Sequence, residues 1–377
     1  ANTTGTYNTA VGAYALDGNT TADSNTALGY AALGGANTGT ANIAVGVNAL
    51  LVNTSGSYNV AMGSYALDAV STGTSNIGIG YTALSTVTTG TNNVAIGHAA
   101  LVVNTASNNV AIGYQTMDST TTGDNNTAVG AYAMSAHTTA TYNVAIGRSA
   151  LDATTTGGGN IAIGFDALGK SVAGYSNVAI GYACMEDANG SISCTAMGYA
   201  AGLDLTTGDN NLLLGYNAGH TNSPSGSLTT ESNQICLGND SIDTAKIRVA
   251  FEATSDVRDK TDFSPLDLGL GFVNQLNPVT YRWDMRSHYL TNGSKDLSSV
   301  TPDGTHREDK LQLGFKGQEV EALEVAEGYS IENKTNLVTN VSADGARHSL
   351  KYDRFVPILV KAVQELSAEI DRLKEQN

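Results

Sequence analysis

One short motif recurs along the first part of the chain at a nearly constant interval. Its consensus is Asn-[Thr/Val/Ile]-Ala-[Val/Ile/Leu/Met]-Gly-x-x-Ala-[Leu/Met]. The step between copies is 17 residues, except for one step of 16 residues from Asn93 to Asn109. A degenerate further copy occupies residues 234–238. The thirteen regular copies start at Asn8, Asn25, Asn42, Asn59, Asn76, Asn93, Asn109, Asn126, Asn143, Asn160, Asn177, Cys194 and Asn211.

A period of 17 residues is too short for a pair of helices and is typical of one coil of a β-solenoid. The residues from Asn to Gly alternate as in a short strand, with Ala on one face and Val or Ile on the other. Both sets are apolar, so we expect both faces to be covered. Glycine recurs at the fifth place, as at Gly97 and Gly147, which indicates a positive φ or a close neighbouring backbone. Because one coil is too small to bury a core, it needs stacked neighbours, and other chains could complete it.

The asparagine at the first place of the motif has two interpretations. It forms a stacked ladder that bonds the backbone, which we favour, or it contacts a ligand. Acidic residues nine places after the motif start are open to two interpretations as well. They are turn residues on a solvated face, or they belong to a calcium ladder or a glycosidase carboxylate pair. These acids skip many coils, which favours the solvated turn, and they are Asp17, Asp68, Asp118, Asp152 and Glu186.

The net charge of −16 argues against nucleic acid or an anionic membrane as a partner, because phosphate binding needs clustered Lys and Arg. Residues 1–254 hold 4 Lys and Arg against 15 Asp and Glu, whereas residues 255–377 hold 15 against 20. We expect no signal peptide and no membrane-inserted segment in this stretch of sequence. The chain begins at Ala1 without a methionine, and we expect it to be part of a longer protein.

The cysteines and histidines form no metal-binding pattern. Cys184, Cys194 and Cys236 match neither a disulfide framework nor a zinc motif. Cys184 replaces the alanine of its repeat, which predicts a small buried side chain, and a disulfide between Cys184 and Cys194 is less favoured. We therefore expect no metal and no cofactor.

Tyrosine is common in the repeats, whereas other aromatic residues are scarce. One set follows the repeat glycine directly: Tyr30, Tyr81, Tyr114, Tyr182, Tyr199 and Tyr216. A second set lies one place later: Tyr14, Tyr65 and Tyr132. Neighbouring places in a strand face opposite sides, so we expect one set to be exposed. The exposed set packs between chains or stacks on sugars, and Tyr81, Tyr114 and Tyr182 are the candidates for receptor binding.

The stretch Ser255-Asp256-Val257-Arg258-Asp259-Lys260 divides the chain, because the repeat ends before it and an ordinary globular composition follows. A serine and a lysine five residues apart fit the pairing of a nucleophile with its base. Farther along, residues 276–283 read Leu-Asn-Pro-Val-Thr-Tyr-Arg-Trp, 313–315 read Leu-Gly-Phe and 318–321 read Gln-Glu-Val-Glu. Tyr352 and a helix-like run over 356–366 come last. In this order the motifs resemble the intramolecular chaperone domain that ends many phage tail fibres, tailspikes and endosialidases.

The resemblance implies that this domain aligns three chains, nucleates the stalk and is then released by cutting between Thr254 and Ser255. It implies that Ser255 is the nucleophile. The serine hydroxyl needs a base, and Lys260 serves as that base only as a neutral amine, which requires burial or a nearby positive charge. We expect Arg258 to supply that charge or to hold the oxyanion, and Asp256 to orient the loop. The activity would be a single-turnover self-cleavage, and we expect no other enzymatic activity.

A homotrimer is favoured by the resemblance, by the thin coils and by an apolar heptad seam near the C-terminus. We predict a mainly β fold, a parallel β-solenoid or β-roll of 17-residue coils over residues 1–219. A degenerate last coil and a connecting strand follow over 220–254. An α+β chaperone and autoprotease domain occupies 255–377, with a coiled-coil helix from about residue 354. The seam residues are Leu359, Val363, Leu366, Ile370 and Leu373.

We predict that the chain is the distal part of a viral tail fibre, located in the virion tail, that binds a glycan or protein receptor on the host cell. The solenoid motif also resembles the head repeats of trimeric autotransporter adhesins. A bacterial trimeric surface adhesin with the same chaperone, located on the cell surface, is therefore an alternative. A polysaccharide-degrading tailspike is a third, although a stalk rich in glycine and alanine has little bulk to form a catalytic groove.

Overall fold

The computed structural model describes residues 2–103, 105–242, 244–246, 248, 255–290, 296–342 and 345–376. The chain forms two compact units. The first unit comprises residues 1–223 and 227–239, and the second comprises 224–226 and 240–377. The alternating residues of the connecting strand predicted before residue 255, Ile247, Val249 and Phe251, lie outside the described residues, as does Thr254.

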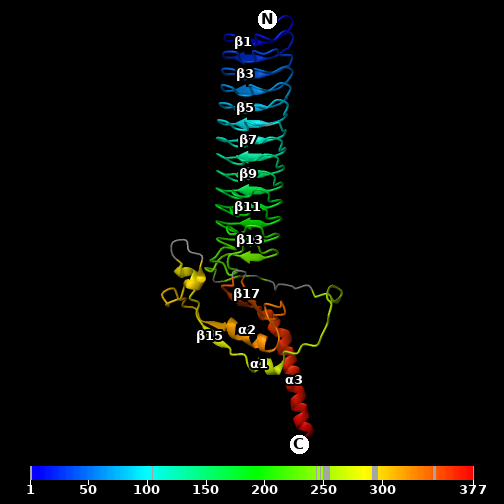
Figure 1. Cartoon of the computed structure of the whole chain (residues 1–377), viewed down its shortest axis with the longest axis vertical. Helices are drawn as coiled ribbons and strands as arrows, with labels where there is room; N and C mark the ends of the chain where they lie inside the picture. Colours follow the sequence, from blue (N-terminus) through cyan, green and yellow to red (C-terminus); the bar gives the residue numbers. More distant parts are fainter. Residues whose placement is uncertain are drawn as a thin grey trace. The chain divides into compact units, whose positions relative to one another are not determined.

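The first unit is a parallel β-solenoid, as the repeat predicts. It contributes one three-residue strand per coil, and the fourteen strands form a single sheet in sequence order (Figure 1). Equivalent places of the motif pair with one another, and Ala95 still pairs with Ala111 across the 16-residue step. The strands are β1 (Thr9–Val11), β2 (Thr26–Leu28), β3 (Ile43–Val45), β4 (Val60–Met62), β5 (Ile77–Ile79), β6 (Val94–Ile96), β7 (Val110–Ile112), β8 (Thr127–Val129), β9 (Val144–Ile146), β10 (Ile161–Ile163), β11 (Val178–Ile180), β12 (Thr195–Met197), β13 (Leu212–Leu214) and β14 (Ile235–Leu237).

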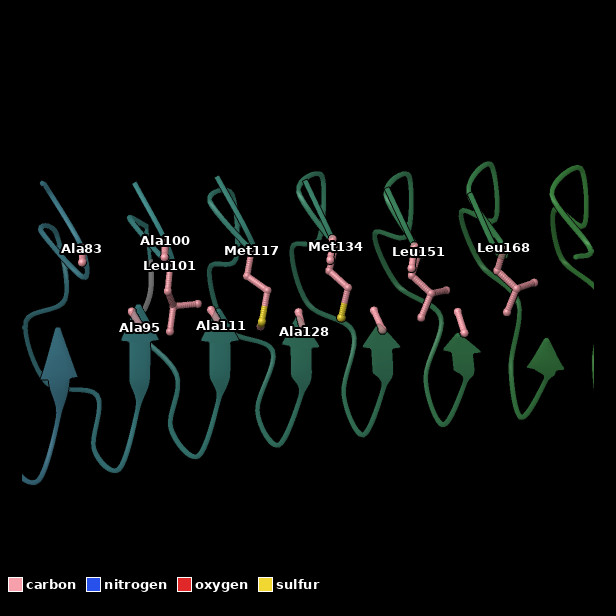
Figure 2. Close-up of a cluster of buried hydrophobic side chains, with 14 of the residues drawn as sticks. Ala83, Ala95, Ala100, Leu101, Ala111, Met117, Ala128, Met134, Leu151 and Leu168 are labelled. Atoms are coloured by element: carbon pink, nitrogen blue, oxygen red, sulfur yellow. The ribbon is translucent and has the colours of Figure 1, made fainter. Parts of the chain in front are cut away.

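The interior of the solenoid is filled by small and medium apolar side chains. In β6 the middle residue Ala95 is fully buried, and Leu101 from the same coil packs into the same core. Figure 2 shows this core continuing from coil to coil through Ala111, Met117 and Met134. Thiols fit the same interior, since Cys184 and Cys194 are both buried. The prediction of a small buried side chain at Cys184 is therefore confirmed.

The opposite face of the sheet is covered less completely. The first and third residues of each strand point away from the core, and in β6 Val94 and Ile96 are both partly exposed. The same holds in β3, where Ile43 is exposed beside the fully buried Ala44. Within one chain, therefore, only one of the two apolar faces is buried inside the coil.

The recurring glycine has both a positive φ and a close neighbouring backbone, the two properties that the sequence indicates. Gly97 has a φ of +140°, in the region that side chains disfavour. A Cβ built on Gly97 would also lie 2.2 Å from the carbonyl oxygen of Gly113 in the next coil. The close stacking of consecutive coils therefore depends on the absence of a side chain here.

The first-place asparagines form a buried ladder. The backbone N–H of Asn93 donates to Oδ1 of Asn76 at 3.0 Å, and its Nδ2 donates to the carbonyl of Ala106 at 2.9 Å. The thiol of Cys194 takes the same place in its coil, where it accepts a longer bond of 3.4 Å from the N–H of Asn211. The ladder interpretation is confirmed, because each side chain satisfies buried backbone groups of two coils.

The second unit combines helices with two small antiparallel sheets, which confirms the predicted α+β region and its C-terminal helix. β15 pairs with β16, and β17 pairs with β18. In chain order the elements are η1 (Val257–Asp259), α1 (Leu270–Val273), β15 (Val279–Tyr281), η2 (Arg286–Tyr289), η3 (Leu297–Ser299), β16 (Gln312–Gly314), α2 (Gly317–Ala326), β17 (Thr339–Val341), β18 (His348–Leu350), η4 (Tyr352–Arg354) and α3 (Phe355–Glu375).

A compact apolar cluster holds these elements together. It joins α1, α2 and α3 through Phe272, Val320 and Phe355. Pro357 lies in the first turn of α3, where the missing N–H leaves no helical bond unmade. The side chain of Glu365 then reaches back to the start of α1, where it accepts the N–H of Leu270 at 2.7 Å. This backbone hydrogen bond lowers the pKa of the Glu365 carboxyl.

Candidate active site

The junction predicted to carry the chemistry forms a single tight turn. The carboxylate of Asp256 accepts the backbone N–H of Arg258 at 2.9 Å and thereby caps η1. The N–H of Lys260 closes the turn on the carbonyl of Val257. As a result, the side chains on either side of η1 meet, and Nζ of Lys260 lies 2.6 Å from Oγ of Ser255. The structure thus brings the proposed nucleophile and base into hydrogen-bond contact.

This contact has the geometry for proton transfer in either direction. An ammonium on Lys260 donates to the Ser255 oxygen, whereas a neutral amine at the same distance could accept the hydroxyl proton. Both residues are exposed within the single chain. One copy of the chain therefore supplies the contact without the burial that favours a neutral amine.

Arg258 is directed at Asp256. Its Nε lies 3.0 Å from Oδ1 of Asp256, and its terminal nitrogen lies 2.5 Å from Oδ2. The hydrogen bonds from Arg258 lower the pKa of the Asp256 carboxyl, so this group stays ionised at neutral pH. In this geometry the guanidinium stabilises the capping carboxylate, and Asp256 in turn fixes the turn that holds Ser255 and Lys260 together.

The other residues that carry the family resemblance form contacts within the second unit. The strand motif at Val279–Tyr281 pairs with Gln312–Gly314, and the N–H of Phe315 donates to the hydroxyl of Tyr352 at 3.2 Å. The rings of Phe315 and Phe355 stack with their centroids 5.4 Å apart. These motif residues therefore hold strands and α3 together.

Gly317, the first residue of α2, lies at a close approach to β18. A Cβ built on Gly317 would lie 2.9 Å from Cβ of His348. The glycine thus allows α2 to approach β18 closely at this point. Nε2 of His348 lies 2.8 Å from Oε2 of Glu321, the next contact along the same pair of elements.

Glu324 is a key residue that the sequence analysis missed. Its buried carboxylate accepts the backbone N–H groups of Leu337 and Val338, each at 2.7 Å, and that of Thr339 at 3.0 Å. The Thr339 hydroxyl donates to it as well. A signal was present, because Glu324 lies four residues after Val320 and so falls on the apolar face of α2.

The candidate receptor residues lie in a column of aromatic side chains along the solenoid. Tyr81, Tyr114 and Tyr182 are 51%, 46% and 49% exposed. His98 stacks between Tyr81 and Tyr114, with centroid distances of 5.3 and 5.2 Å. Tyr182 stacks between neighbours in the same way, in the run Phe165, Tyr182, Tyr199 and Tyr216. Rings stacked on both faces present mainly their edges and hydroxyl groups to solvent.

The expectation that the two tyrosine sets face opposite sides is wrong. Tyr14 belongs to one set and Tyr30 to the other, yet their rings meet edge to face at 5.5 Å and both are exposed. The reason is that these residues follow the strand and lie in a turn. Tyr14 has a φ of +59°, so the alternation of an extended chain does not apply.

Two further structural facts bear on the kind of site. Among the described residues, no group of three or more His, Cys, Asp or Glu side chains is arranged to hold a metal ion. Within the same described part of the chain, none of the helices has the length and apolar character needed to cross a membrane.

Along the chain, the structure thus shows a stack of repeated coils and then an α+β unit that contains the contact between Ser255 and Lys260. Residues 255–329 match the model of a peptidase family described as chaperone of endosialidase. The match begins at Ser255 and, with the solenoid, fits a tail fibre with a C-terminal chaperone domain. A domain of this kind implies trimeric assembly and autoproteolytic cleavage. No curated protein matches the chain.

Proposed function

We propose that this chain is the distal, receptor-binding part of a viral tail fibre, and that its C-terminal domain assembles three chains and then cuts itself off between Thr254 and Ser255. The observation that carries the cleavage is the 2.6 Å contact between Oγ of Ser255 and Nζ of Lys260, at the first residue of the family match. An endosialidase-type tail protein would be extracellular or associated with the virion.

The reaction follows from the position of the serine beside the bond to be cut. Neutral Lys260 takes the hydroxyl proton of Ser255, and Oγ attacks the carbonyl carbon of Thr254. The bond from this carbon to the Ser255 nitrogen breaks, and the nitrogen takes up a proton as it leaves. Thr254 is then joined to Oγ as an ester. Water opens this ester, which leaves a carboxylate on Thr254 and a free hydroxyl and amino group on Ser255.

Assembly would provide the missing burial around the lysine. Three copies closing around the junction would remove Lys260 from water, which favours its neutral form and delays cutting until the chains have assembled. Arg258 would add a positive charge near the lysine or hold the oxyanion, while Asp256 keeps the turn in place.

The surfaces of the single chain support association of several copies. The Val and Ile face of the solenoid sheet is partly exposed, as at Ile43 and Ile146. The seam of α3 is exposed as well, with Leu359, Val363 and Leu366 all accessible. Contiguous apolar surfaces of this kind mark protein interfaces. Three identical chains would cover both, and a heptad seam of this length needs partner helices.

The cleavage is tested by denaturing mass spectrometry of the wild type and of Ser255→Ala and Lys260→Ala. We expect the wild type to yield a fragment that begins at Ser255, and both variants to remain uncut but trimeric in light scattering. Lys310→Ala, at another exposed lysine of the domain, is the matched control and should cut normally. Cleavage that survives in Ser255→Ala would contradict the mechanism. An uncut wild type would mean that the domain is a trimerisation unit that stays attached. A monomeric mass in light scattering would contradict the trimer.

Receptor binding is the second testable part of this function. We expect the triple variant Tyr81→Ala, Tyr114→Ala and Tyr182→Ala to lose binding to host cells while its trimer and its β-sheet circular dichroism signal persist. The reason is that the aromatic column presents exposed ring edges and hydroxyl groups along the solenoid. Tyr58→Ala with Tyr142→Ala is the matched control and should bind as the wild type does, because these exposed tyrosines precede the first-place asparagines and lie outside the column. Undiminished binding by the triple variant would show that the receptor binds at another part of the protein.

A further inference from the structure

We propose that Asp240 and a binding site formed by Ser287 and Arg347 hold the chaperone domain on the stalk after the chain has been cut. This inference rests on the proposed cleavage position and adds a separate release step to it. Within the second unit, the chain after the cut contributes a guanidinium and a hydroxyl, and the chain before the cut contributes the buried carboxylate of Asp240.

The contact is a buried, two-pronged ion pair. The two terminal nitrogens of Arg347 lie 3.0 and 2.8 Å from Oδ1 and Oδ2 of Asp240. The side chains of Asp240 and Arg347 are only 2% and 13% exposed. The hydroxyl of Ser287 donates to Oδ2 of the same carboxylate. Paired bonds between a guanidinium and a carboxylate are strong and geometrically specific.

Neighbouring groups fix this site in position. Arg286, next to Ser287, donates to the carbonyl of Leu297 at 3.2 Å and to the carbonyl of Ala346. The second bond ties η2 directly to the residue before Arg347. The hydroxyl and the guanidinium that bind Asp240 are therefore held together by a hydrogen bond from the Arg286 side chain to the Ala346 carbonyl.

The order of these residues along the chain gives the contact its role. Asp240 precedes the proposed cleavage site, whereas Ser287 and Arg347 follow it. Cutting between Thr254 and Ser255 therefore leaves Asp240 joined to the solenoid and places its partners on the released fragment. The cut itself breaks none of these hydrogen bonds. Because buried charge pairs mainly affect dissociation rates, the fragment should stay bound until the pair breaks.

A second ion pair in the same unit provides a comparison. Arg282 lies 4.0 Å from Asp309, a side chain that is fully exposed. Exposed pairs at this distance contribute little and are screened by salt. Removal of Arg282 should therefore leave retention unchanged, whereas removal of Arg347 leaves Asp240 buried without its charge partner.

The test separates cutting from release. In the full chain carrying Ser255→Ala, residues 249–254 are replaced by the recognition sequence of a specific endoprotease, so that added protease makes the cut. Size-exclusion chromatography then follows separation of the two fragments over time. We expect the parent to stay together, and Asp240→Asn or Arg347→Met to separate about 100-fold faster. Arg282→Met should behave as the parent does.

Additivity distinguishes a direct contact from general loosening. If the two residues act through each other, Asp240→Asn combined with Arg347→Met should separate little faster than either single variant. Circular dichroism checks folding, and Asp240→Asn alone decides the question if Arg347→Met does not fold. Prompt separation of the parent, or equal rates in all variants, overturns the proposal. Self-cleavage of the wild type is measured independently, so a failure of the proposed cleavage is recognised separately.

Discussion

The two units of the chain are stabilised by contacts of different range. In the solenoid, the backbone N–H of Val94 donates to the carbonyl of Asn109 at 2.8 Å, and the same kind of bond recurs from coil to coil. In the second unit, Glu365 bonds a backbone group 95 residues away, and Arg347 pairs with a carboxylate 107 residues away. The solenoid thus repeats one local contact, whereas the second unit depends on several long-range contacts that occur once.

This difference determines how each unit should respond to damage. The stability of a repeat array is roughly a sum of terms between neighbouring repeats, so a defect in one coil weakens mainly the coils beside it. In the second unit each long-range contact occurs once, so no equivalent contact compensates for its loss. Loss of one buried contact there should reduce the stability of the whole unit.

The largest effect is expected for Gly147→Val in the solenoid. Gly147 has a φ of +135°, and a Cβ there would lie 2.4 Å from the carbonyl oxygen of Gly164. Backbone strain alone costs about 1–3 kcal/mol per chain, and the clash adds to it. Hydrogen exchange should increase in the flanking coils and stay unchanged in distant ones. Gly190→Val is the control for the clash, because Gly190 also has a positive φ, +104°, but nothing lies near its Cβ position. If hydrogen exchange in Gly147→Val rises along the entire solenoid, the local model is wrong.

A comparable but unit-wide effect is expected for Glu324→Ala. The substitution leaves three backbone N–H groups, of Leu337, Val338 and Thr339, without the carboxylate that satisfies them. Buried donors without partners cost about 1–3 kcal/mol each, so the second unit should lose about 3 kcal/mol or more. Urea denaturation followed by the fluorescence of Trp283 measures this loss. Glu327→Ala, at an exposed residue of the same helix end, should change little.

The smallest effect concerns a residue that occurs once inside the solenoid. His137 is fully buried with Nδ1 near the hydroxyl of Thr120, and burial lowers its pKa from 6.5 to about 4. Because the fold favours the neutral ring, its stability is fully present above pH 6.5 and decreases as the pH falls toward 4. The expected loss between pH 7.5 and pH 5 is about 2 kcal/mol.

Thermal denaturation at these two pH values, compared with that of His137→Thr, checks this prediction. Threonine occupies the equivalent places at Thr120 and Thr154, so the variant should fold and lose part of the pH dependence. An identical pH dependence in both proteins would show that His137 is not the group responsible.

The two units also differed in how far the sequence could predict them. The solenoid was predictable because Asn93 and Gly97 serve the same structural purpose as their equivalents in the other coils, and repetition makes that purpose visible. The relative orientation of the two tyrosine sets was predicted wrongly, because the positive φ after the strand is not encoded in a simple alternation. In the second unit, the place of Glu324 on the apolar face of α2 indicated its burial but not its partners, and no pattern indicated the pair of Asp240 with Arg347, because these contacts occur once.

The candidate site was predictable from the sequence only in part. Ser255 and Lys260 could be paired from their spacing and from the family resemblance, since one turn of η1 suffices to bring them together. Their exposure in the single chain could not be predicted, because burial depends on surfaces far away in sequence or on other copies of the chain.

The constant register of the coils has a genetic consequence. Since equivalent places always pair, removing the stretch from Asn59 to just before Asn76 would join two coils whose surfaces already match. In-frame recombination between repeats would therefore lengthen or shorten the solenoid in units of one strand spacing, about 4.8 Å, without a new fold. The 16-residue step, across which β6 and β7 keep their pairing, shows that such a unit tolerates the loss of a residue. The length of the solenoid thus becomes a quantity that selection can adjust one coil at a time.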